Sequence, residues 1–184
     1  MFRLVFVRHG DDINDRLTRL GKKQAKILAK QLDVEGIDAI FCSPKNRAFK
    51  TAKILARHLK IADVVIDERL DEREKISSTT NNEDLKEFKL NYLNTDYSHK
   101  NPEGCKQYFK RILDFLNEIR TKNQGKTVLI VGHSSFTYVL LSYVYGSQNT
   151  EAIWSRVSNC AKLCFELDVT QEDKQKFYLW YVLN

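Results

Sequence analysis

The sequence is poor in residues that break or cross-link a chain. Its 184 residues include 7 Gly and 2 Pro, which argues against low-complexity segments and long disordered linkers. Its 4 cysteines show no CxxC spacing, and Cys42, Cys160 and Cys164 lie among apolar residues, as buried free thiols of a reducing compartment do. No apolar run approaches the ~20 residues of a membrane-spanning helix. We therefore expect a soluble, cytoplasmic protein that does not bind a membrane.

The charge of the chain is positive but dispersed. A formal net charge of +6 and a pI near 9.1 would suit an anionic partner. The basic residues, however, are scattered along predicted helices, as in GKKQAKILAK (21–30), which is typical of solvated helix faces. We do not expect nucleic-acid binding, which requires a continuous basic face with stacking aromatic residues. The sequence leaves the oligomeric state open.

Apolar strands alternate with amphipathic helices along the chain. Strands are predicted at 4–7, 37–41, 64–66, 127–131, 162–167 and 177–183. Helices are predicted from Thr18 to before Gly36, from Ser43 and Pro44 to Leu59, and over 83–93, 103–121 and 136–145. The pattern predicts an α/β fold, a three-layer α/β/α sandwich whose central sheet is mostly parallel with an antiparallel edge. We expect one domain over 1–184, in which 77–104 forms a lid or specificity insertion.

Two details of this prediction concern helix starts. Thr18 is the expected N-cap of the first helix, with Leu20, Leu28 and Leu32 on or near its apolar face. Ser43 is the expected N-cap of the second helix, because it precedes a proline suited to a first turn.

Polar residues directly follow the most apolar strands. His9 comes after LVFVR, His133 comes after VLIVG, and Arg47 lies in the first turn predicted after the IDAIF strand. In a parallel sheet these positions meet at the carboxyl edge, where α/β proteins bind ligands. Two imidazoles, two guanidinium groups (Arg8 and Arg47) and helix N-termini form an anion site, since guanidinium forks offer phosphate bidentate bonds. His58 and His99 have no such setting.

Five motifs strengthen this interpretation when they are taken together. They are RHG (8–10), LTRLGKKQA (17–25), SPKNRAFKTA (43–52), LDERE (70–74) and GHSSF (132–136). In this order and spacing they resemble the histidine phosphatase (phosphoglycerate-mutase-like) superfamily over essentially the whole chain. The length of the chain is similar to that of the compact phosphatase branch.

The resemblance implies a role for several of the side chains in these motifs. His9 would be the nucleophile that forms a phosphohistidine intermediate, and Glu72 would protonate the leaving oxygen. Arg8, Arg47 and His133 would hold the phosphoryl group. No metal and no organic cofactor would be required. The chemistry also requires a neutral His9, which nearby cations favour, and a carbonyl on its other ring nitrogen would fix the tautomer.

The chain departs from the usual family pattern after RHG. Asp11 and Asp12 stand where Glu or Gln and then Thr or Ser are frequent, and Asp15 stands where an Asn is frequent. Asn14 is one place early and remains a candidate phosphate contact. Acids beside a phosphate pocket would repel an anionic substrate unless they turn outward or meet a cationic group on it.

Three further positions near the predicted site differ or are less certain. Ser134 follows His133 where Gly is frequent, and it is a candidate substrate contact. Cys105 stands where the family has a Glu. Asn159 resembles an Asn that often precedes the penultimate strand.

The leading functional hypothesis is a metal-independent phosphatase that acts on a small phosphomonoester or a phosphoprotein and releases inorganic phosphate. The alternatives are phosphoglycerate-mutase-type phosphoryl transfer, a phosphohistidine protein phosphatase, and a non-catalytic phosphate-binding regulatory module. A binding module would not need the proton donor Glu72, which favours the enzymes.

Overall fold

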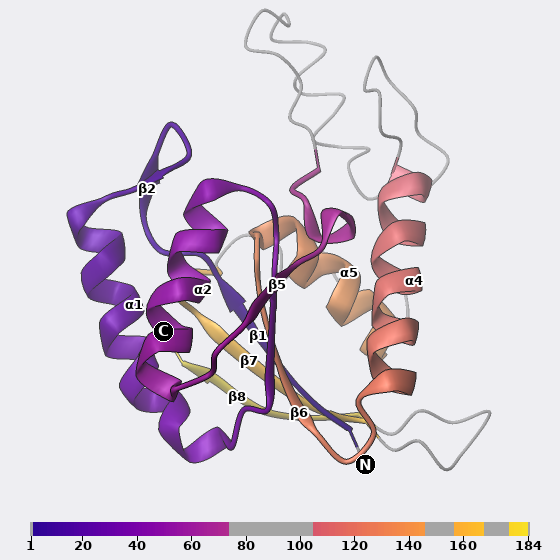
Figure 1. Ribbon diagram of the computed structural model, residues 1–184. Helices are drawn as coiled ribbons and strands as arrows, with labels where there is room; N and C mark the ends of the chain where they lie inside the picture. The colour runs from indigo at the N-terminus through magenta and orange to yellow at the C-terminus, as the bar shows by residue number, and fades with distance from the viewer. Residues whose placement is uncertain (1, 74–104, 146–156, 168–176, 184) are drawn as a thin grey trace, which may run out of the picture.

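The computed structural model describes residues 2–73, 105–145, 157–167 and 177–183 (Figure 1). The strands are β1 (Phe2–Arg8), β2 (Asp12–Ile13), β3 (Arg16–Leu17), β4 (Ala39–Cys42), β5 (Val64–Ile66), β6 (Thr127–Gly132), β7 (Lys162–Leu167) and β8 (Phe177–Leu183). The helices are α1 (Arg19–Leu32), α2 (Asn46–Leu59), α4 (Cys105–Lys122) and α5 (Ser134–Tyr145), with one-turn helices η1 (Asp33–Glu35) and η2 (Glu68–Leu70). The helix predicted over 83–93 and the insertion predicted at 77–104 lie outside the described residues.

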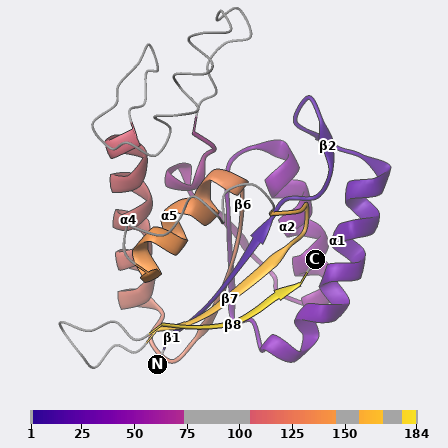
Figure 2. The ribbon, with the colours of Figure 1, turned by 180° about the vertical axis from the view of Figure 1, so that it is seen from behind.

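The main sheet has the strand order β5-β4-β6-β1-β7-β8. β5, β4, β6 and β1 are parallel neighbours, whereas β7 pairs antiparallel with both β1 and β8. Figure 2 shows β7 and β8 as neighbours at one edge of the sheet. The predicted mostly parallel sheet with an antiparallel edge is therefore confirmed.

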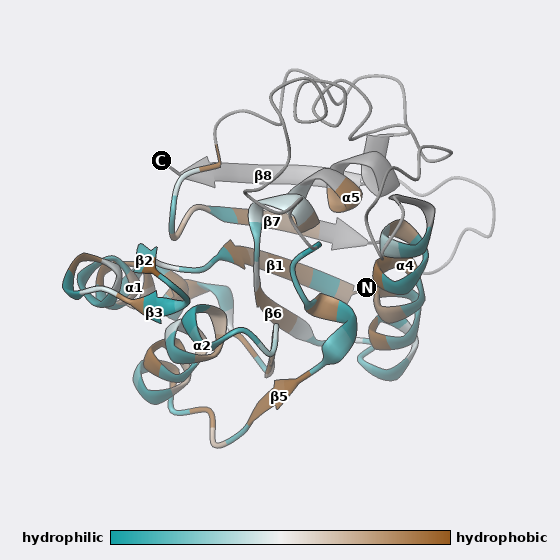
Figure 3. Cartoon of the chain, turned by 90° about the horizontal axis from the view of Figure 1, so that it is seen from above, coloured by the Kyte–Doolittle hydropathy of each residue, from teal (hydrophilic) through white to brown (hydrophobic). Residues whose placement is uncertain are grey.

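Helices cover both faces of the sheet, as Figure 3 shows from above. α4 and α5 pack on one face, where Phe6, Phe115 and Phe136 are fully buried. α1 and α2 pack on the other face, against alternate strand residues such as Val5 and Val131. Successive strand residues point to opposite faces, so the continuous apolar strands supply both cores of the predicted three-layer sandwich.

Two details of the predicted helices are wrong. α2 begins at Asn46, and its N-cap residue Lys45 makes no side-chain capping bond, so Ser43 does not cap this helix. Thr18 does cap α1, since its hydroxyl accepts a hydrogen bond from Gly21 N, but Leu20 is 55% exposed. Gly21 occupies the buried face instead, because a Cβ there would lie 2.1 Å from Asp11 O.

None of the helices within the described ranges is long and apolar enough to cross a membrane.

Candidate active site

The four parallel strands all contribute to one edge of the sheet. β1 ends at Arg8 and leads directly to His9, and its neighbour β6 leads to His133. β4 leads to Ser43 and then to α2, while β5 leads to η2 and Glu72. The rings of the two histidines lie edge to face, with centroids 5.2 Å apart. The predicted meeting of both histidines at the carboxyl edge is confirmed.

His9 is held in one tautomer. Its Nδ1 lies 2.8 Å from the carbonyl oxygen of Gly10, which can only accept, so Nδ1 carries the hydrogen and Nε2 keeps a lone pair. Burial, together with the charges of Arg47 and Arg8, lowers the pKa of His9 from 6.5 to about 4. The neutral ring with a carbonyl on one nitrogen, as predicted from the sequence, is thus the form that this environment favours, and the lone pair lies on Nε2.

The backbone around His9 is fixed by bonds from distant segments. Gly10 N donates to Thr51 Oγ1 on α2 (3.1 Å), and Asn159 Nδ2 donates to the carbonyl of His9 (3.1 Å). Gly10 cannot carry a side chain, because a Cβ would lie 2.7 Å from Gly21 O. The RHG segment is therefore packed tightly against α1, α2 and the chain before β7.

Arg47 lies at the centre of a cluster formed with His9, His133, Asp15 and Glu72. Its Nε donates to His9 Nε2 (3.2 Å), its Nη1 to Asp15 Oδ1 (2.7 Å), and its Nη2 to Glu72 Oε2 (2.5 Å). Nη2 also lies 3.3 Å from His133 Nδ1. The side chain is only 10% exposed. One guanidinium group thus contacts both histidines and two carboxylates.

His133 is completely buried at the start of α5. Its Nε2 lies 2.7 Å from Ser43 Oγ, and with Arg47 donating to Nδ1 this arrangement puts the ring hydrogen on Nε2. Burial first, and then the charge of Arg47, lower the pKa of His133 well below 6.5. Ser43 therefore supports this histidine rather than capping α2.

Arg8 is the second guanidinium group at the edge. It donates through Nη1 to the carbonyl of Val157, and its Nε is buried with no partner among the described residues. Burial lowers the pKa of Arg8, an effect that the nearby charges of Glu72 and Asp12 oppose. Part of its hydrogen-bonding capacity is thus unused.

Glu72 follows a turn that α4 supports. Arg111 on α4 donates from Nη1 to the carbonyls of Arg69 (2.5 Å) and Asp71 (2.9 Å). The Arg111 guanidinium also lies over the ring of Tyr108, whose hydroxyl donates to Ser135 Oγ on α5 (2.8 Å). These contacts link the turn before Glu72 to the helix that follows His133.

The three acids after RHG have different environments. Asp11 turns away from the histidines and accepts a hydrogen bond from Thr18 Oγ1 (2.6 Å). Asp12 lies beside His9, with Oδ1 3.6 Å from His9 Nδ1 and 3.9 Å from Arg47 Nε. Asp15 binds Arg47 from the tip of the β2–β3 hairpin.

Asp15 also caps α2 from outside that helix. Its carboxylate accepts from the backbone N–H groups of Asn46 (3.0 Å) and Arg47 (3.2 Å), and its carbonyl accepts from Asn46 Nδ2 (2.8 Å). Burial raises the pKa of Asp15, but the bonds from Arg47 and Asn46 outweigh that effect and hold the pKa below its usual range. Asn14, in contrast, is exposed at the hairpin tip.

The sequence does not indicate that Asp15 caps α2 and binds Arg47, or that Ser43 contacts His133. A local signal existed for the hairpin: Asn14 and Asp15 form its two-residue loop, both with positive φ (49° and 62°), and Asn or Asp in such loops is typical of type I′ turns. No local pattern indicates that Ser43 contacts a histidine 90 residues later.

Two other predicted positions are less informative. Ser134 is the first residue of α5 and is half-buried. The side chain of Cys105 lies outside the part of the chain whose side chains are described.

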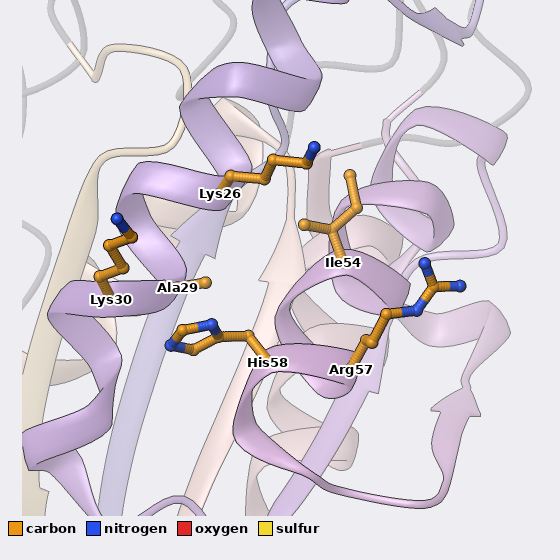
Figure 4. A pocket seen from close by; sticks show the side chains of 6 residues that line it. All are labelled: Lys26, Ala29, Lys30, Ile54, Arg57 and His58. Carbon is orange, nitrogen blue, oxygen red and sulfur yellow. The ribbon is translucent and has the colours of Figure 1, made fainter.

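A separate hollow of about 350 Å³ lies between the C-terminal halves of α1 and α2 (Figure 4). It is lined by Lys26, Ala29, Lys30, Ile54, Arg57 and His58. Arg47 lies at the opposite end of α2, so this hollow is not part of the histidine cluster. Within the described ranges, no group of three or more His, Cys, Asp or Glu side chains is arranged to hold a metal ion.

Comparison with known proteins agrees with this geometry. Residues 4–179 match the family model of the histidine phosphatase superfamily (branch 1). The chain is 29% identical over 173 residues to a putative phosphoserine phosphatase 2 of Hydrogenobacter thermophilus, covering 84% of each chain. It is 26% identical over 181 residues to a probable phosphoglycerate mutase of Shigella boydii, covering 88% of this chain and 83% of the relative.

A solved structure supports the fold. The phosphoserine phosphatase of Entamoeba histolytica, in a mutant form bound to phosphoserine, superposes with a TM-score of 0.76 at 18% identity, covering 99% of this chain and 96% of the other. The family match over nearly the whole chain, together with two histidines and two arginines at one sheet edge, leads to one conclusion: the chain is an enzyme that belongs to branch 1 of the histidine phosphatase superfamily.

Proposed function

We propose that the protein is a phosphatase that hydrolyses a small phosphomonoester through a phosphohistidine on His9, without a metal ion. The observation that carries the proposal is the state of His9. Its Nδ1–H is held by Gly10 O, and its Nε2 lone pair points to Arg47 in a cluster that keeps the ring neutral. A neutral imidazole with a fixed tautomer can attack phosphorus once the phosphoryl group replaces His9 as the partner of Arg47 Nε.

In the first step the Nε2 lone pair attacks phosphorus, so that an N–P bond forms and the P–O bond of the ester breaks. When the substrate binds, a proton from solvent replaces the ion pair between Glu72 and Arg47, and Glu72 then gives this proton to the leaving oxygen. In the second step water attacks phosphorus, the N–P bond breaks, and the proton from water returns to the Glu72 carboxylate as inorganic phosphate forms.

Positive charge around the phosphoryl group comes from the protein in this mechanism. Arg8 and Arg47 supply guanidinium groups, and His133 lies against Arg47 Nη2. Phosphoryl transfer depends mainly on positioning and on cations near the equatorial oxygens. Two guanidinium groups in place supply the kind of charge that a metal ion supplies in other phosphatases.

The names of the relatives support a small substrate. One is named a putative phosphoserine phosphatase, and another a probable phosphoglycerate mutase. The mutase name makes phosphoryl transfer to a second sugar-acid hydroxyl the second candidate function. We also propose that the enzyme acts in the cytoplasm, since Cys42, Cys160 and Cys164 are free thiols.

Hydrolysis of para-nitrophenyl phosphate in excess chelator tests this proposal. We expect the wild type to retain its activity, His9→Ala to abolish it, and Glu72→Gln to lower kcat by roughly a hundredfold or more. An acid-labile, base-stable phosphoryl label should form on the wild type and on Glu72→Gln but not on His9→Ala. The control is His58→Gln, which changes an exposed histidine paired with Asp33.

Two results would contradict the proposal. Activity that is lost in chelator and restored by a divalent cation would exclude metal independence. Activity that survives in His9→Ala would exclude the phosphohistidine. Exchange of phosphate between the isomers of phosphoglycerate that is faster than the release of inorganic phosphate would favour the mutase.

A further inference from the structure

One acid of the hairpin remains beside the reacting groups without a strong partner. The side chain of Asp12 is 23% exposed, and its Oδ1 lies 3.6 Å from His9 Nδ1 and 3.9 Å from Arg47 Nε. Among the described residues, its carboxylate accepts no hydrogen bond. Asp11 is bonded to Thr18 and Asp15 to the N-terminus of α2, so neither carboxylate lies beside His9 without a hydrogen bond, as that of Asp12 does.

This placement creates an electrostatic conflict with a phosphate ligand. The phosphoryl group must approach Nε2 of the ring whose Nδ1 lies next to Asp12. Arg47, the nearest cation, is already shared by Asp15 and Glu72. Arg8, the second cation, lies within the electrostatic influence of both Glu72 and Asp12. Two guanidinium groups thus face three carboxylates before any phosphate binds. A phosphate dianion and a carboxylate a few Å apart repel strongly in a half-buried site unless a proton or another cation lies near both.

We propose that Asp12 is a specificity-determining residue that receives a positively charged amine of the substrate, so that the preferred substrates are phosphomonoesters of amino alcohols. The proposal rests on the proposed function and adds the substrate class to it. An ammonium group two carbon atoms from the ester oxygen can fold along the side of the phosphoryl group, where Asp12 lies. There the ammonium neutralises the charge that a purely anionic substrate leaves uncompensated.

A different role for Asp12 is also conceivable chemically. A carboxylate near Nδ1 would stabilise the positive charge that develops on the His9 ring as the N–P bond forms. That effect would be the same for every substrate. The selective role is favoured because Gly10 O already holds Nδ1 at 2.8 Å, whereas Asp12 Oδ1 is outside hydrogen-bond distance and open to solvent.

Two matched substrate pairs test the proposal, each differing only in an amine against a hydroxyl. They are O-phosphoserine against 3-phosphoglycerate, and phosphoethanolamine against 2-hydroxyethyl phosphate. In the wild type we expect kcat/KM to be at least tenfold higher for the amine in each pair, about 1.4 kcal/mol of discrimination. In Asp12→Asn this ratio should fall towards one, and inorganic phosphate should inhibit more strongly because the repulsion is gone.

The matched control is Asp11→Asn, which removes a neighbouring negative charge that faces α1 and should keep the preference of the wild type. A wild type without a preference for the amine would overturn the proposal. So would an Asp12→Asn variant that loses activity equally on all four substrates, or one that binds inorganic phosphate more weakly. Para-nitrophenyl phosphate carries no amine, so its hydrolysis does not depend on the role proposed for Asp12. If the wild type hydrolyses it through His9 but shows no amine preference, the proposal for Asp12 fails while the proposed function stands.

Discussion

At the scale of single residues, Asp15 connects three parts of the site. It lies at the hairpin tip, binds the guanidinium of Arg47, and accepts hydrogen bonds from the first N–H groups of α2. A carboxylate at a helix N-terminus satisfies donors that otherwise lack a partner. We infer that Asp15 is a positioning residue that aims Arg47 at the phosphoryl group, although it does not itself face His9.

Replacing Asp15 should therefore weaken phosphate binding. We expect Asp15→Gly, which tolerates the positive φ of this position, to lower kcat/KM roughly tenfold to a hundredfold, since small displacements of positioning groups have such effects. Asp15→Asn should recover part of the loss, because it still accepts a backbone hydrogen bond. The inhibition constant of inorganic phosphate should rise in the same order. A purely structural role predicts instead a lower melting temperature with unchanged phosphate inhibition.

The residue scale is also where sequence and structure differ most. His9, Arg47 and His133 were predictable because each follows an apolar strand at the carboxyl edge. The uses of Asp15 and Ser43 were not, because each depends on a contact between segments 31 to 90 residues apart. Ser43 illustrates the difficulty. A serine before a proline suits an N-cap, but in the structure its hydroxyl is the hydrogen-bond partner of the buried His133 ring.

At the scale of elements, α4 supports the turn that carries Glu72, the proposed proton donor. Arg111 binds the carbonyls of Arg69 and Asp71, and Leu70 between them is buried against the same core as α4. Glu72 follows immediately and reaches Arg47. The position of Glu72 therefore depends on a helix that begins more than 30 residues later in the sequence.

Removing this support should affect the step that uses Glu72. We expect Arg111→Met to lower kcat for para-nitrophenyl phosphate roughly tenfold, because the carboxyl group is no longer held in register with the leaving oxygen. In the Glu72→Gln background the same change should have little further effect, since groups that act as a unit are not additive. Lys110→Met is the control, because Lys110 is exposed and pairs with Asp114. Effects of the two changes that simply multiply would exclude the coupling.

Element types were predictable, but some boundaries were not. The strands at 162–167 and 177–183 are found where their apolar patterns indicated. α2 begins two residues after Pro44, because the acceptor for its first N–H groups comes from the hairpin and not from its own sequence. The predicted apolar face of α1 includes Leu20, but Leu20 is exposed and Gly21 lies on the buried face. Two backbone segments approach each other closely at Gly21, which leaves no space for a side chain there.

At the scale of the whole molecule, the packing of the sandwich determines where the two histidines lie. The apolar interiors on both faces of the sheet hold β1 and β6 together as neighbouring parallel strands. That pairing brings His9 and His133 to the same edge, where burial keeps both rings neutral. The catalytic arrangement is therefore linked to global stability, because the unfolded chain has no means of lowering these pKa values.

This linkage predicts how stability depends on pH. The pKa of His9 is about 4 when folded, against about 6.5 in an unfolded chain. Between these values the unfolded state binds more protons, so the free energy of unfolding falls as the pH is lowered. From pH 7.5 to pH 5 the loss from His9 should be about 2 kcal/mol, and His133 acts in the same sense. Urea unfolding at both pH values should show a smaller loss in His9→Gln, with the exposed His58→Gln as the control for replacing a histidine. An equal loss in His9→Gln and the wild type would mean that His9 is not held neutral by the fold.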